Sequence, residues 1–388
     1  MFNFLLKTLI SGRNYVKWPR CRSSALVTIT WLALAIPMLN ACATNATTTT
    51  AGPNNSELAT GTSPKSAVTL TPNVSPHSNE ITTRPPALST IAFLATSSPA
   101  GANNQAGCGQ ATPLKPATSQ NQTLAVKAAG ARGNATRSYR LHLPSSYQPT
   151  QPQAVLLVFH GHGGNAADME NVSGFSSLAD QQDFIAVYPQ GIADDYGLPM
   201  WASVGPAADY GIDDLSFVND LLKQLQKQVC VDGRRIYATG FSNGGGMSHY
   251  LACKLTERIA AVVPIAGNYF PLPDGGCQPS RAVALLEIHG TADNVISYNG
   301  RPDKDYPGWP LPAMADYLAE WASRNGCGKG PQTFLDTSEI KGEEWSGCRD
   351  NSTVAHYQIK GGSHSYPAAI GSRSSQEVIW TFLASHRT

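Results

Sequence analysis

The sequence predicts an α/β domain with a doubly wound, mostly parallel sheet over residues 107–388, and three observations support this. Continuous apolar runs such as Ala154–His160 are typical of strands buried on both faces of a parallel sheet. Segments with helical spacing separate these runs, and strand-helix alternation gives a doubly wound sheet. The pattern Gly-Phe-Ser-Asn-Gly at 240–244 stands between a predicted strand and a predicted helix.

The strands are predicted from apolar runs of strand length that are bounded by turn residues. A glycine-rich segment, Gly161-His162-Gly163-Gly164, follows the second strand, and Pro189 stops the third. In chain order the predicted strands are Ser138–Leu143, Ala154–His160, Phe184–Tyr188, Arg235–Phe241, Ala260–Ile265, Val283–His289 and Val354–Ile359.

The helices between these strands are predicted from apolar residues at helical spacing. In the second of them, Asp213 is expected to be the N-cap, and the apolar residues from Leu215 to Val229 share one face. In chain order the predicted helices are Met169–Leu178, Leu215–Val229, Asn243–Lys254, Met314–Asn325 and Gln376–Ser385.

The chemistry is concentrated in Gly240-Phe241-Ser242-Asn243-Gly244, which matches G-x-S-x-G. The strand before it and the glycine-rich helix start after it supply the context that the motif requires. So tight a turn needs small residues beside the serine, and it lifts the serine hydroxyl above the carboxyl end of the sheet. The sequence therefore predicts an α/β-hydrolase with Ser242 as the nucleophile. The alternative is a serine that only caps the helix.

A serine hydroxyl needs a base to remove its proton, and the base needs an acid to hold its tautomer. In this fold the acid and the histidine follow the serine, each after a later strand. Asp293 and His364 each follow a predicted strand, so both are expected at the same sheet edge as Ser242. The alternatives are a turn-forming aspartate, with Asp274 as the rival acid, and a surface histidine.

A tetrahedral oxyanion needs at least two positioned N–H donors. The backbone of Asn243, directly after the nucleophile, is expected to supply one. The other is expected from the glycine-rich loop after Ala154–His160, with His162 as the donor. The alternative is a glycine-rich turn without a catalytic part. Other histidines of the domain are interpreted as packing, loop-shaping or strand residues, namely His160, His249, His289 and His356.

Composition and charge exclude other classes of protein. The chain carries 28 Lys and Arg against 27 Asp and Glu, a net charge of +1, whereas nucleic-acid binding needs a clustered basic excess. Hydrophobic residues make up 41% of the 388 residues, too few for a polytopic membrane protein. The sequence holds no C-x-x-C or H-x-x-x-H pair, so no zinc site is predicted.

The N-terminus has the layout of an export signal. Residues 1–22 are basic without an acid, and the uncharged run Ala25–Leu39 follows, whose 15 residues are fewer than the ~20 of a spanning helix. Leu39-Asn40-Ala41-Cys42 resembles a lipoprotein cleavage box. Residues 1–42 are therefore predicted to be a lipoprotein-type signal with lipid on Cys42. The alternatives are an uncleaved signal anchor and an ordinary signal peptide.

Residues 43–106 are rich in Thr, Ser, Pro, Asn and Ala and show no sustained apolar period. Such a segment cannot bury enough apolar surface to offset its ordering entropy. We predict a disordered linker that holds the catalytic domain, residues 107–388, away from a membrane or wall surface.

The number of cysteines agrees with export. One of the eight cysteines lies in the predicted signal and another ends it, which leaves six. An even number in an oxidising compartment favours up to three disulfides. Cys327 and Cys348 flank one loop segment and are the predicted pair. Three connectivities stay open for the other four, which are Cys108, Cys230, Cys253 and Cys277.

Six segments together resemble one family: FHGHGGN, GIDDLSFVNDLL, VDGRRIYATGFSNGGGMSHYLAC, HGTADNVISYNG, EWASRNGC and GGSHSYP. In one collinear order over about 107–388 they are similar to the secreted esterases grouped with polyhydroxybutyrate depolymerases and feruloyl esterases. The resemblance implies an α/β-hydrolase fold and hydrolysis of carboxylic esters without a cofactor. It also implies the triad already reached, Ser242, Asp293 and His364.

The resemblance also bears on four other positions. The family usually has Trp two residues after the catalytic histidine, and here that position is Tyr366, an aromatic wall of different shape. Trp201 stands where the family has a substrate-lining Trp, although from the sequence alone it is equally expected to be a core residue. Cys327 and Cys348 fall where the family places cysteines.

Extracellular depolymerases of solid polyester generally resemble this domain with an added substrate-binding module. Only 24 residues follow His364, and the N-terminal extension is predicted to be unstructured. We therefore expect a secreted, monomeric serine esterase that acts on feruloyl or acetyl esters of plant cell-wall xylan and meets a membrane only through its lipid. Hydroxyalkanoate oligomers of polyhydroxybutyrate are the alternative substrate. A non-catalytic surface binding protein is the distant alternative.

Overall fold

The computed structural model describes residues 106–127, 130, 136–202, 205–272, 276–305 and 308–388. The predicted signal with Cys42, the predicted linker up to residue 105 and the rival acid Asp274 lie outside the described residues. The strands are β1 (Ser119–Ala125), β2 (Thr136–His142), β3 (Gln153–Phe159), β4 (Phe184–Pro189), β5 (Ile192–Ala193), β6 (Pro199–Met200), β7 (Val231–Phe241), β8 (Ala261–Ile265), β9 (Ala284–Gly290), β10 (Lys329–Asp336), β11 (Ile340–Ser346), β12 (Val354–Ile359), β13 (Ala369–Ile370) and β14 (Arg373–Ser374). The α-helices are α1 (Ala166–Ser173), α2 (Phe175–Gln182), α3 (Asp214–Gln228), α4 (Asn243–Lys254), α5 (Met314–Arg324) and α6 (Ser375–Ala384).

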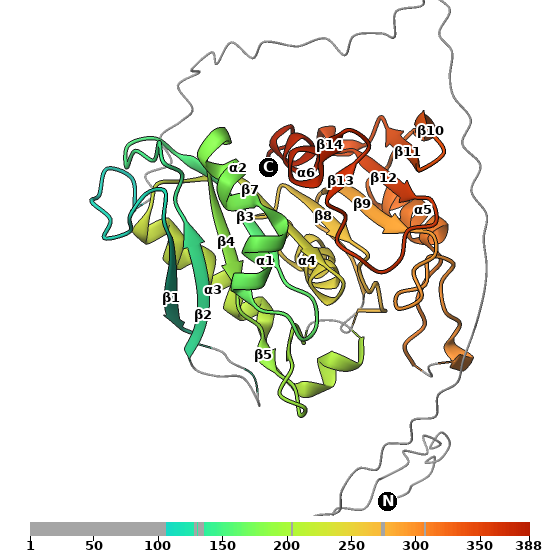
Figure 1. Ribbon diagram of the computed structural model, residues 1–388, viewed down its shortest axis with the longest axis horizontal. Coiled ribbons are helices and arrows are strands. Elements are labelled where there is room, and N and C mark those ends of the chain that lie inside the picture. The colour runs from blue at the N-terminus through green and yellow to red at the C-terminus, as the bar shows by residue number, and fades with distance from the viewer. Residues whose placement is uncertain (1–105, 128–129, 131–135, 203–204, 273–275, 306–307) are drawn as a thin grey trace, which may run out of the picture. The chain divides into compact units, whose positions relative to one another are not determined.

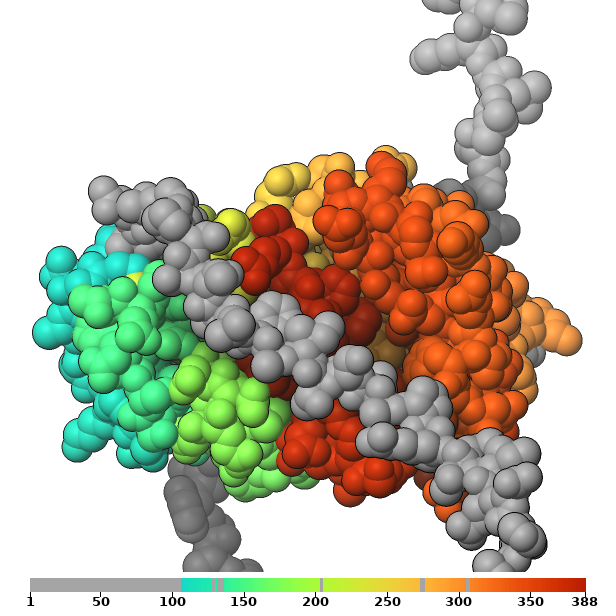
Figure 2. All heavy atoms as spheres, turned by 90° about the horizontal axis from the view of Figure 1, so that it is seen from above, coloured from blue at the N-terminus to red at the C-terminus, as the bar shows by residue number. Residues whose placement is uncertain are grey.

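Within the described part of the chain, one large sheet runs in the order β1-β2-β4-β3-β7-β8-β9-β12-β11-β10. Its central strands from β4 to β12 are parallel to one another. Antiparallel strands extend it at both ends. Figure 2 shows the two ends on opposite sides of the domain, with the N-terminal strands in cyan and the β10–β11 region in orange. The predicted α/β-hydrolase fold, with its mostly parallel sheet, is confirmed.

Helices cover both faces of the sheet (Figure 1). Residues of α3, α4 and α5 share one hydrophobic core with Val155 and Leu157 of β3. Residues of α1, α2 and α6 share a second core with Leu156 and Val158, the alternate residues of the same strand. Because successive side chains of a strand point to opposite faces, β3 must be apolar on both faces, and its residues from Ala154 to Phe159 are all apolar.

Most predicted elements agree with the observed ones within a few residues. Asp213 caps α3 as predicted, since its Oδ1 accepts from the Ser216 amide at 2.8 Å. The helix predicted over Met169–Leu178 is instead two helices, because Gly174 between them has the left-handed φ of 68°. As a result Val172, an apolar residue within the predicted range, is 60% exposed.

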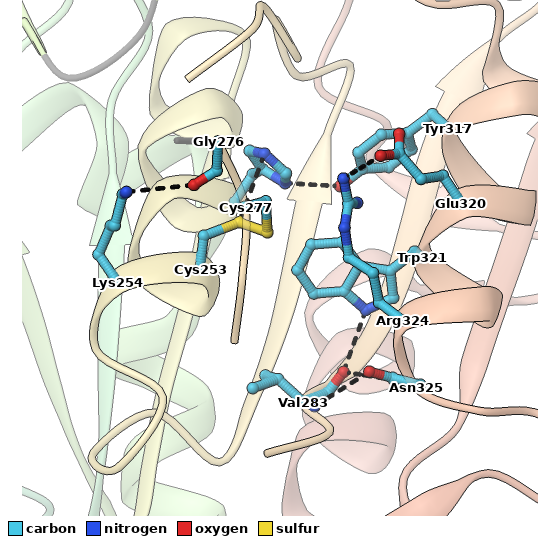
Figure 3. The surroundings of a disulfide bond; sticks show 11 residues. Cys253, Lys254, Gly276, Cys277, Val283, Tyr317, Glu320, Trp321, Arg324 and Asn325 are labelled. Atoms are coloured by element: carbon cyan, nitrogen blue, oxygen red, sulfur yellow. Dashed lines mark hydrogen bonds and ion pairs between the residues drawn. A yellow bond between two sulfur atoms is a disulfide. The ribbon is translucent and has the colours of Figure 1, made fainter. Parts of the chain in front are cut away.

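Three disulfides join the described cysteines in pairs. Cys327 bonds to Cys348, as predicted. Figure 3 shows the bond between Cys253 of α4 and Cys277 of the loop after β8, next to a hydrogen bond from Lys254 Nζ to the Gly276 carbonyl. The remaining bond joins Cys108 to Cys230. Disulfides persist in oxidising compartments, so the set fits an exported protein. None of the described helices is long and apolar enough to cross a membrane.

Removing the Cys108–Cys230 bond by a double alanine substitution is expected to destabilise the fold more than removing Cys327–Cys348. The first bond joins residues 122 apart and the second residues 21 apart, and closing a longer loop removes more entropy from the unfolded chain. The chain-entropy relation gives a difference of about 1.5 kcal/mol in the free energy of unfolding. Denaturant unfolding of both variants beside the parent measures it, and equal losses would contradict the expectation.

Candidate active site

Ser242 lies in a sharp turn between β7 and α4. Its φ of 56° and ψ of −119° are rare for a residue with a side chain and cost about 1–3 kcal/mol. The neighbouring glycines permit the turn: a Cβ on Gly240 would come within 2.4 Å of the Gly244 carbonyl oxygen, and one on Gly244 within 2.2 Å of the Phe159 carbonyl oxygen. The Ser242 amide donates to the Ile265 carbonyl at 2.9 Å, which fixes the turn on β8.

The structure brings Ser242, His364 and Asp293 together at the carboxyl edge of the sheet. They follow β7, β12 and β9, respectively. His364 Nε2 lies 2.9 Å from Ser242 Oγ, and His364 Nδ1 lies 2.7 Å from Asp293 Oδ2. The histidine side chain is 14% exposed and the carboxylate is fully buried. The imidazole therefore connects the serine hydroxyl to an enclosed acid, which is the arrangement that nucleophile, base and orienting acid require.

Backbone donors hold the other oxygen of the Asp293 carboxylate. Its Oδ1 accepts from the amides of Val295 and Ile296, each at 2.8 Å, so Oδ2 is left to face the imidazole. The ring of Phe241 packs against that imidazole, with 4.8 Å between the ring centres. The acid and the base are thus held by contacts independent of the serine.

The two backbone amides predicted as oxyanion donors belong to neighbouring elements. The Asn243 amide belongs to the first residue of α4, where a helix has no internal acceptor for its N–H groups. The His162 amide belongs to the loop after β3. This loop lies against the nucleophile, since a Cβ on Gly161 would stand 3.5 Å from Ser242 Cβ.

The loop that begins at His160 after β3 and carries the His162 amide is called the oxyanion loop here. The hairpin of β5 and β6 holds it in place. The Gly163 amide donates to the Pro199 carbonyl at 2.8 Å. His162 Nε2 lies 2.8 Å from Asp194 Oδ2, and hydrogen bonds, first that from the Leu198 amide, lower the pKa of Asp194. The tip of the hairpin carries exposed apolar side chains, Tyr196 at 86% and Leu198 at 44%.

The Asn243 side chain has a role that the sequence did not predict. Its Oδ1 accepts from the Trp201 amide at 2.7 Å, and its Nδ2 donates to the Trp201 carbonyl at 3.0 Å. Trp201 in turn donates from Nε1 to the His160 carbonyl at 2.9 Å, at the start of the oxyanion loop. One tryptophan therefore joins the nucleophile helix to that loop.

Trp201 is fully buried and lies edge-on to Phe159, with 5.0 Å between the ring centres. An enclosed ring offers no face to a substrate. The structure therefore agrees with the expectation of a core residue and corrects the assignment of Trp201 to substrate binding. His160, interpreted as loop-shaping, has that role, because its Nδ1 bonds the Gly161 carbonyl at 2.7 Å and its Nε2 accepts from the Gly191 amide at 3.0 Å.

Tyr366 packs edge-on against Phe241, with 6.3 Å between the ring centres, and Phe241 packs against His364. Its hydroxyl is buried and has no hydrogen-bond partner among the described residues, and burial raises the pKa of that hydroxyl. Tyr366 thus supports the imidazole through Phe241, and its assignment to substrate binding stays a prediction.

One cluster of potential metal ligands occurs in the described residues, away from the triad. The ligand atoms of His249, Cys253 and Cys277 lie within 4.8 Å of one another. The two sulfurs are bonded to each other, so neither offers the thiolate that binds a metal. A cavity of about 660 Å³ opens nearby, between the loop after β8 and α5, and its lining includes Tyr269 and Tyr317 but no triad residue.

Known proteins match the region that carries this geometry. Residues 137–310 match the family described as esterase PHB depolymerase. Probable feruloyl esterase C of Aspergillus clavatus is 29% identical over 250 residues, which cover 64% of this chain and 83% of that protein. The chain is thus similar to esterases of this family across the region that carries the site. The resemblance seen in its motifs, to polyhydroxybutyrate depolymerases and feruloyl esterases, is confirmed.

Two other relatives match this chain over part of their own length. Feruloyl esterase B of Piromyces equi is 33% identical over 232 residues, 59% of this chain and 42% of that protein. The bifunctional acetylxylan esterase/xylanase XynS20E of Neocallimastix patriciarum is 27% identical over 254 residues, 64% of this chain and 33% of that protein. This chain thus spans less than half the length of both. The solved structure of an acetyl xylan esterase from Aspergillus awamori superposes with a TM-score of 0.48 at 13% identity, over 68% of this chain and 99% of that one.

Replacing Asn243 with Ala is expected to lower kcat for a soluble ester at least about tenfold, with a smaller change in KM. The backbone amide at 243 remains, but the loop with Trp201 loses its two hydrogen bonds to α4 and with them the fixed position of the oxyanion donors. Steady-state kinetics beside an Asn121→Ala control, on the edge strand β1, measures the effect. Unchanged kcat in a folded variant would contradict it.

Proposed function

We propose that this chain is a serine carboxylic-ester hydrolase. The observation that carries the proposal is the hydrogen-bonded chain from Ser242 Oγ through His364 to Asp293, with contacts of 2.9 and 2.7 Å. The match of residues 137–310 to an esterase family supports the same reaction. The three side chains and two amides supply nucleophile, base, acid and oxyanion donors, so the reaction needs no cofactor.

In the first half-reaction, His364 Nε2 removes the Ser242 proton as Oγ attacks the carbonyl carbon of the ester. The amides of Asn243 and His162 hold the oxygen that becomes negative. The protonated imidazole then gives its proton to the departing alcohol, and the acyl group stays on Ser242.

In the second half-reaction, a water molecule gives a proton to His364 and attacks the acyl carbon. The second tetrahedral intermediate collapses, the proton passes from His364 back to Ser242 Oγ, and the acid leaves. Asp293 remains ionised throughout and stabilises the imidazolium each time it forms.

A non-catalytic binding protein on the same scaffold is the alternative. A binding surface has no need of a strained serine, a histidine within 2.9 Å of its hydroxyl and a buried aspartate on the far side of the ring. A binding function therefore does not explain the geometry of the site, and the hydrolase function is favoured.

Replacing Ser242 with Ala is expected to lower kcat for a soluble ester by several orders of magnitude, since removal of the nucleophile from a serine hydrolase costs on the order of 10⁶. A fluorophosphonate probe should label the parent and a Ser385→Ala control but not the variant. Near-normal turnover in Ser242→Ala, or no labelling of the parent, would overturn the proposed function.

For the substrate, we propose feruloyl or acetyl esters on plant cell-wall xylan. The named activities of the three relatives above, feruloyl esterase and acetylxylan esterase, support this class. The family described as PHB depolymerase supports hydroxyalkanoate oligomers as the alternative.

A parallel assay of methyl ferulate, acetylated xylan and hydroxybutyrate oligomers tests the substrate class. At least one of the first two is expected to show the highest kcat/KM. Activity on the hydroxybutyrate oligomers alone would replace the proposed substrate with the alternative and leave the serine-esterase mechanism in place.

For location, we propose a monomer anchored at the cell surface by lipid on Cys42, with residues 43–106 as a linker. The lipoprotein-like box at 39–42 and the composition of the linker support the proposal, and the three disulfides fit the exported domain.

A further inference from the structure

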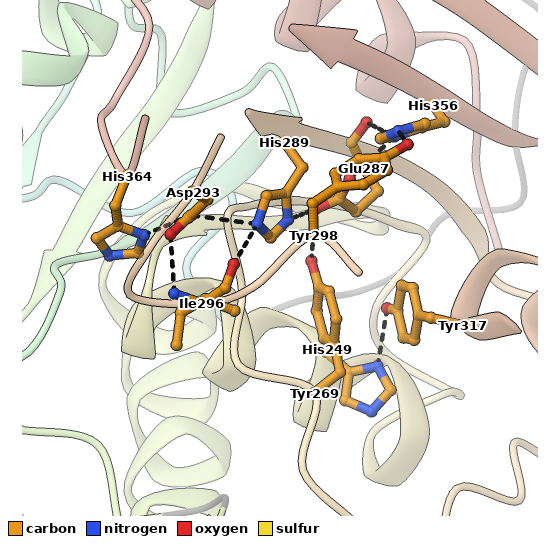
Figure 4. A network of polar contacts seen from close by, with 10 residues as sticks. All are labelled: His249, Tyr269, Glu287, His289, Asp293, Ile296, Tyr298, Tyr317, His356 and His364. Carbon is orange, nitrogen blue, oxygen red and sulfur yellow. Dashed lines mark hydrogen bonds and ion pairs between the residues drawn. The ribbon is translucent and has the colours of Figure 1, made fainter. Parts of the chain in front are cut away.

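A line of buried charged side chains continues from the triad into the core (Figure 4). His289 Nε2 lies 3.2 Å from Asp293 Oδ2, the oxygen that also holds His364. On its other side, His289 Nδ1 lies 3.0 Å from Glu287 Oε1. The side chains of Glu287, His289 and Asp293 are all fully buried. One enclosed imidazole thus stands between two enclosed carboxylates.

The partners of His289 define its protonation. Besides Asp293, its Nε2 faces the Ile296 carbonyl oxygen at 2.9 Å, and its Nδ1 faces Glu287. A carbonyl and ionised carboxylates only accept hydrogen bonds. Both ring nitrogens must therefore carry a hydrogen, so the side chain is an imidazolium cation.

Two other groups contact the Glu287 carboxylate. Tyr269 donates to Glu287 Oε1 at 3.1 Å. His356, on β12, lies 2.9 Å from Glu287 Oε2 and 3.1 Å from the Glu287 carbonyl through Nδ1, and its Nε2 lies 2.9 Å from the Tyr298 hydroxyl. A hydroxyl can donate as well as accept, whereas both ring nitrogens of His289 face groups that only accept. The geometry therefore requires a cation at His289 and not at His356.

The pKa directions agree with this assignment. Burial alone would lower the pKa of His289, but the charge of Glu287 and its hydrogen bond, with further contributions from Ile296 and Asp293, raise it overall. Burial alone would raise the pKa of Glu287, but chiefly the charge of His289 lowers it to about 2. Because the pKa of His289 is raised on folding, the stabilisation it brings is fully present below its ordinary value of 6.5. That stabilisation is lost as the pH rises through the raised value.

We propose that His289, held as a cation by Glu287, is a positioning residue for the triad. It orients Asp293 through its contact with the oxygen that holds His364, and its charge offsets the charge of that buried carboxylate. Its positive charge also opposes a second positive charge on His364. The inference rests on the proposed function. No proton leaves His289 in the cycle, since the serine proton travels only to His364 and on to the alcohol.

The pH dependence of kcat/KM for 4-nitrophenyl acetate tests the proposal, because its acidic limb reports protonation of the free enzyme's base. His289→Gln is expected to move that limb upward by about one pH unit, as removal of a nearby cation favours protonation of His364 and leaves the Glu287 charge uncompensated. The double variant Glu287→Gln/His289→Gln, which removes that charge, should return part of the shift.

The matched control is His142→Gln. His142, on β2, is buried, and its Nε2 lies 3.1 Å from Oδ1 of the partly exposed Asp180 on α2, outside the triad. Loss of this histidine-carboxylate contact should leave the limb in place. A uniform fall of kcat/KM in His289→Gln with an unmoved limb would overturn the proposal. If the single variant does not fold, the neutral double variant gives the comparison with the parent.

A spectroscopic measurement on the parent protein needs neither activity nor a folded variant. In ¹⁵N-histidine-labelled protein at neutral pH, both ring nitrogens of His289 should show protonated chemical shifts, and a single-tautomer neutral ring would overturn the proposal. Failure of the parent to turn over any ester would instead contradict the proposed function. The two failures are therefore distinguishable.

Discussion

The carboxylate of Asp293 is a negative charge that the fold encloses completely, and an enclosed charge is tolerated only where opposite charge and hydrogen-bond donors surround it. Its donors come from the amides of Val295 and Ile296 on one oxygen and from His364 and His289 around the other. The loop after β9 must therefore wrap around the side chain, and the loop after β12 must bring a histidine to it. The positions of both loops follow from this requirement.

The strained serine imposes a second requirement at the same sheet edge. Its turn is possible because Gly240 and Gly244 have no side chain: a Cβ at either position would collide with backbone atoms of the turn, β3 or the residue after β3. Strain of this kind persists where the surroundings determine it fully. Here, parallel strands on one side and a helix on the other provide those surroundings. The serine and the aspartate are thus fixed by separate parts of the sheet, and His364 bridges them.

The triad was predictable because its residues follow strands whose apolar runs are unmistakable, and the ends of parallel strands share one edge. The strands β1, β10 and β11, at the two ends of the sheet, were not predicted, because strands with one or both faces in solvent need no apolar run; β10 is exposed along nearly its whole length.

The parts of the site that escaped prediction depend on side-chain direction. The sequence predicted a role only for the backbone amide of Asn243, whereas its side chain hydrogen-bonds to the backbone of Trp201. His289 and Asp293 are separated by a turn, and the sequence spacing does not reveal that the imidazole folds onto the carboxylate, nor that Glu287 lies at its other nitrogen. Such contacts depend on three-dimensional arrangement alone.

The hairpin that fastens the oxyanion loop holds it through a backbone carbonyl and one aspartate, yet presents Tyr196 and Leu198 to solvent. The groups that hydrogen-bond to the oxyanion loop are thus different from the side chains that are exposed to solvent. Substitutions at the exposed tip of the hairpin can therefore change which ester binds at the rim of the site without disturbing the catalytic residues beneath it. This separation gives a simple physical basis for one scaffold serving many different esters.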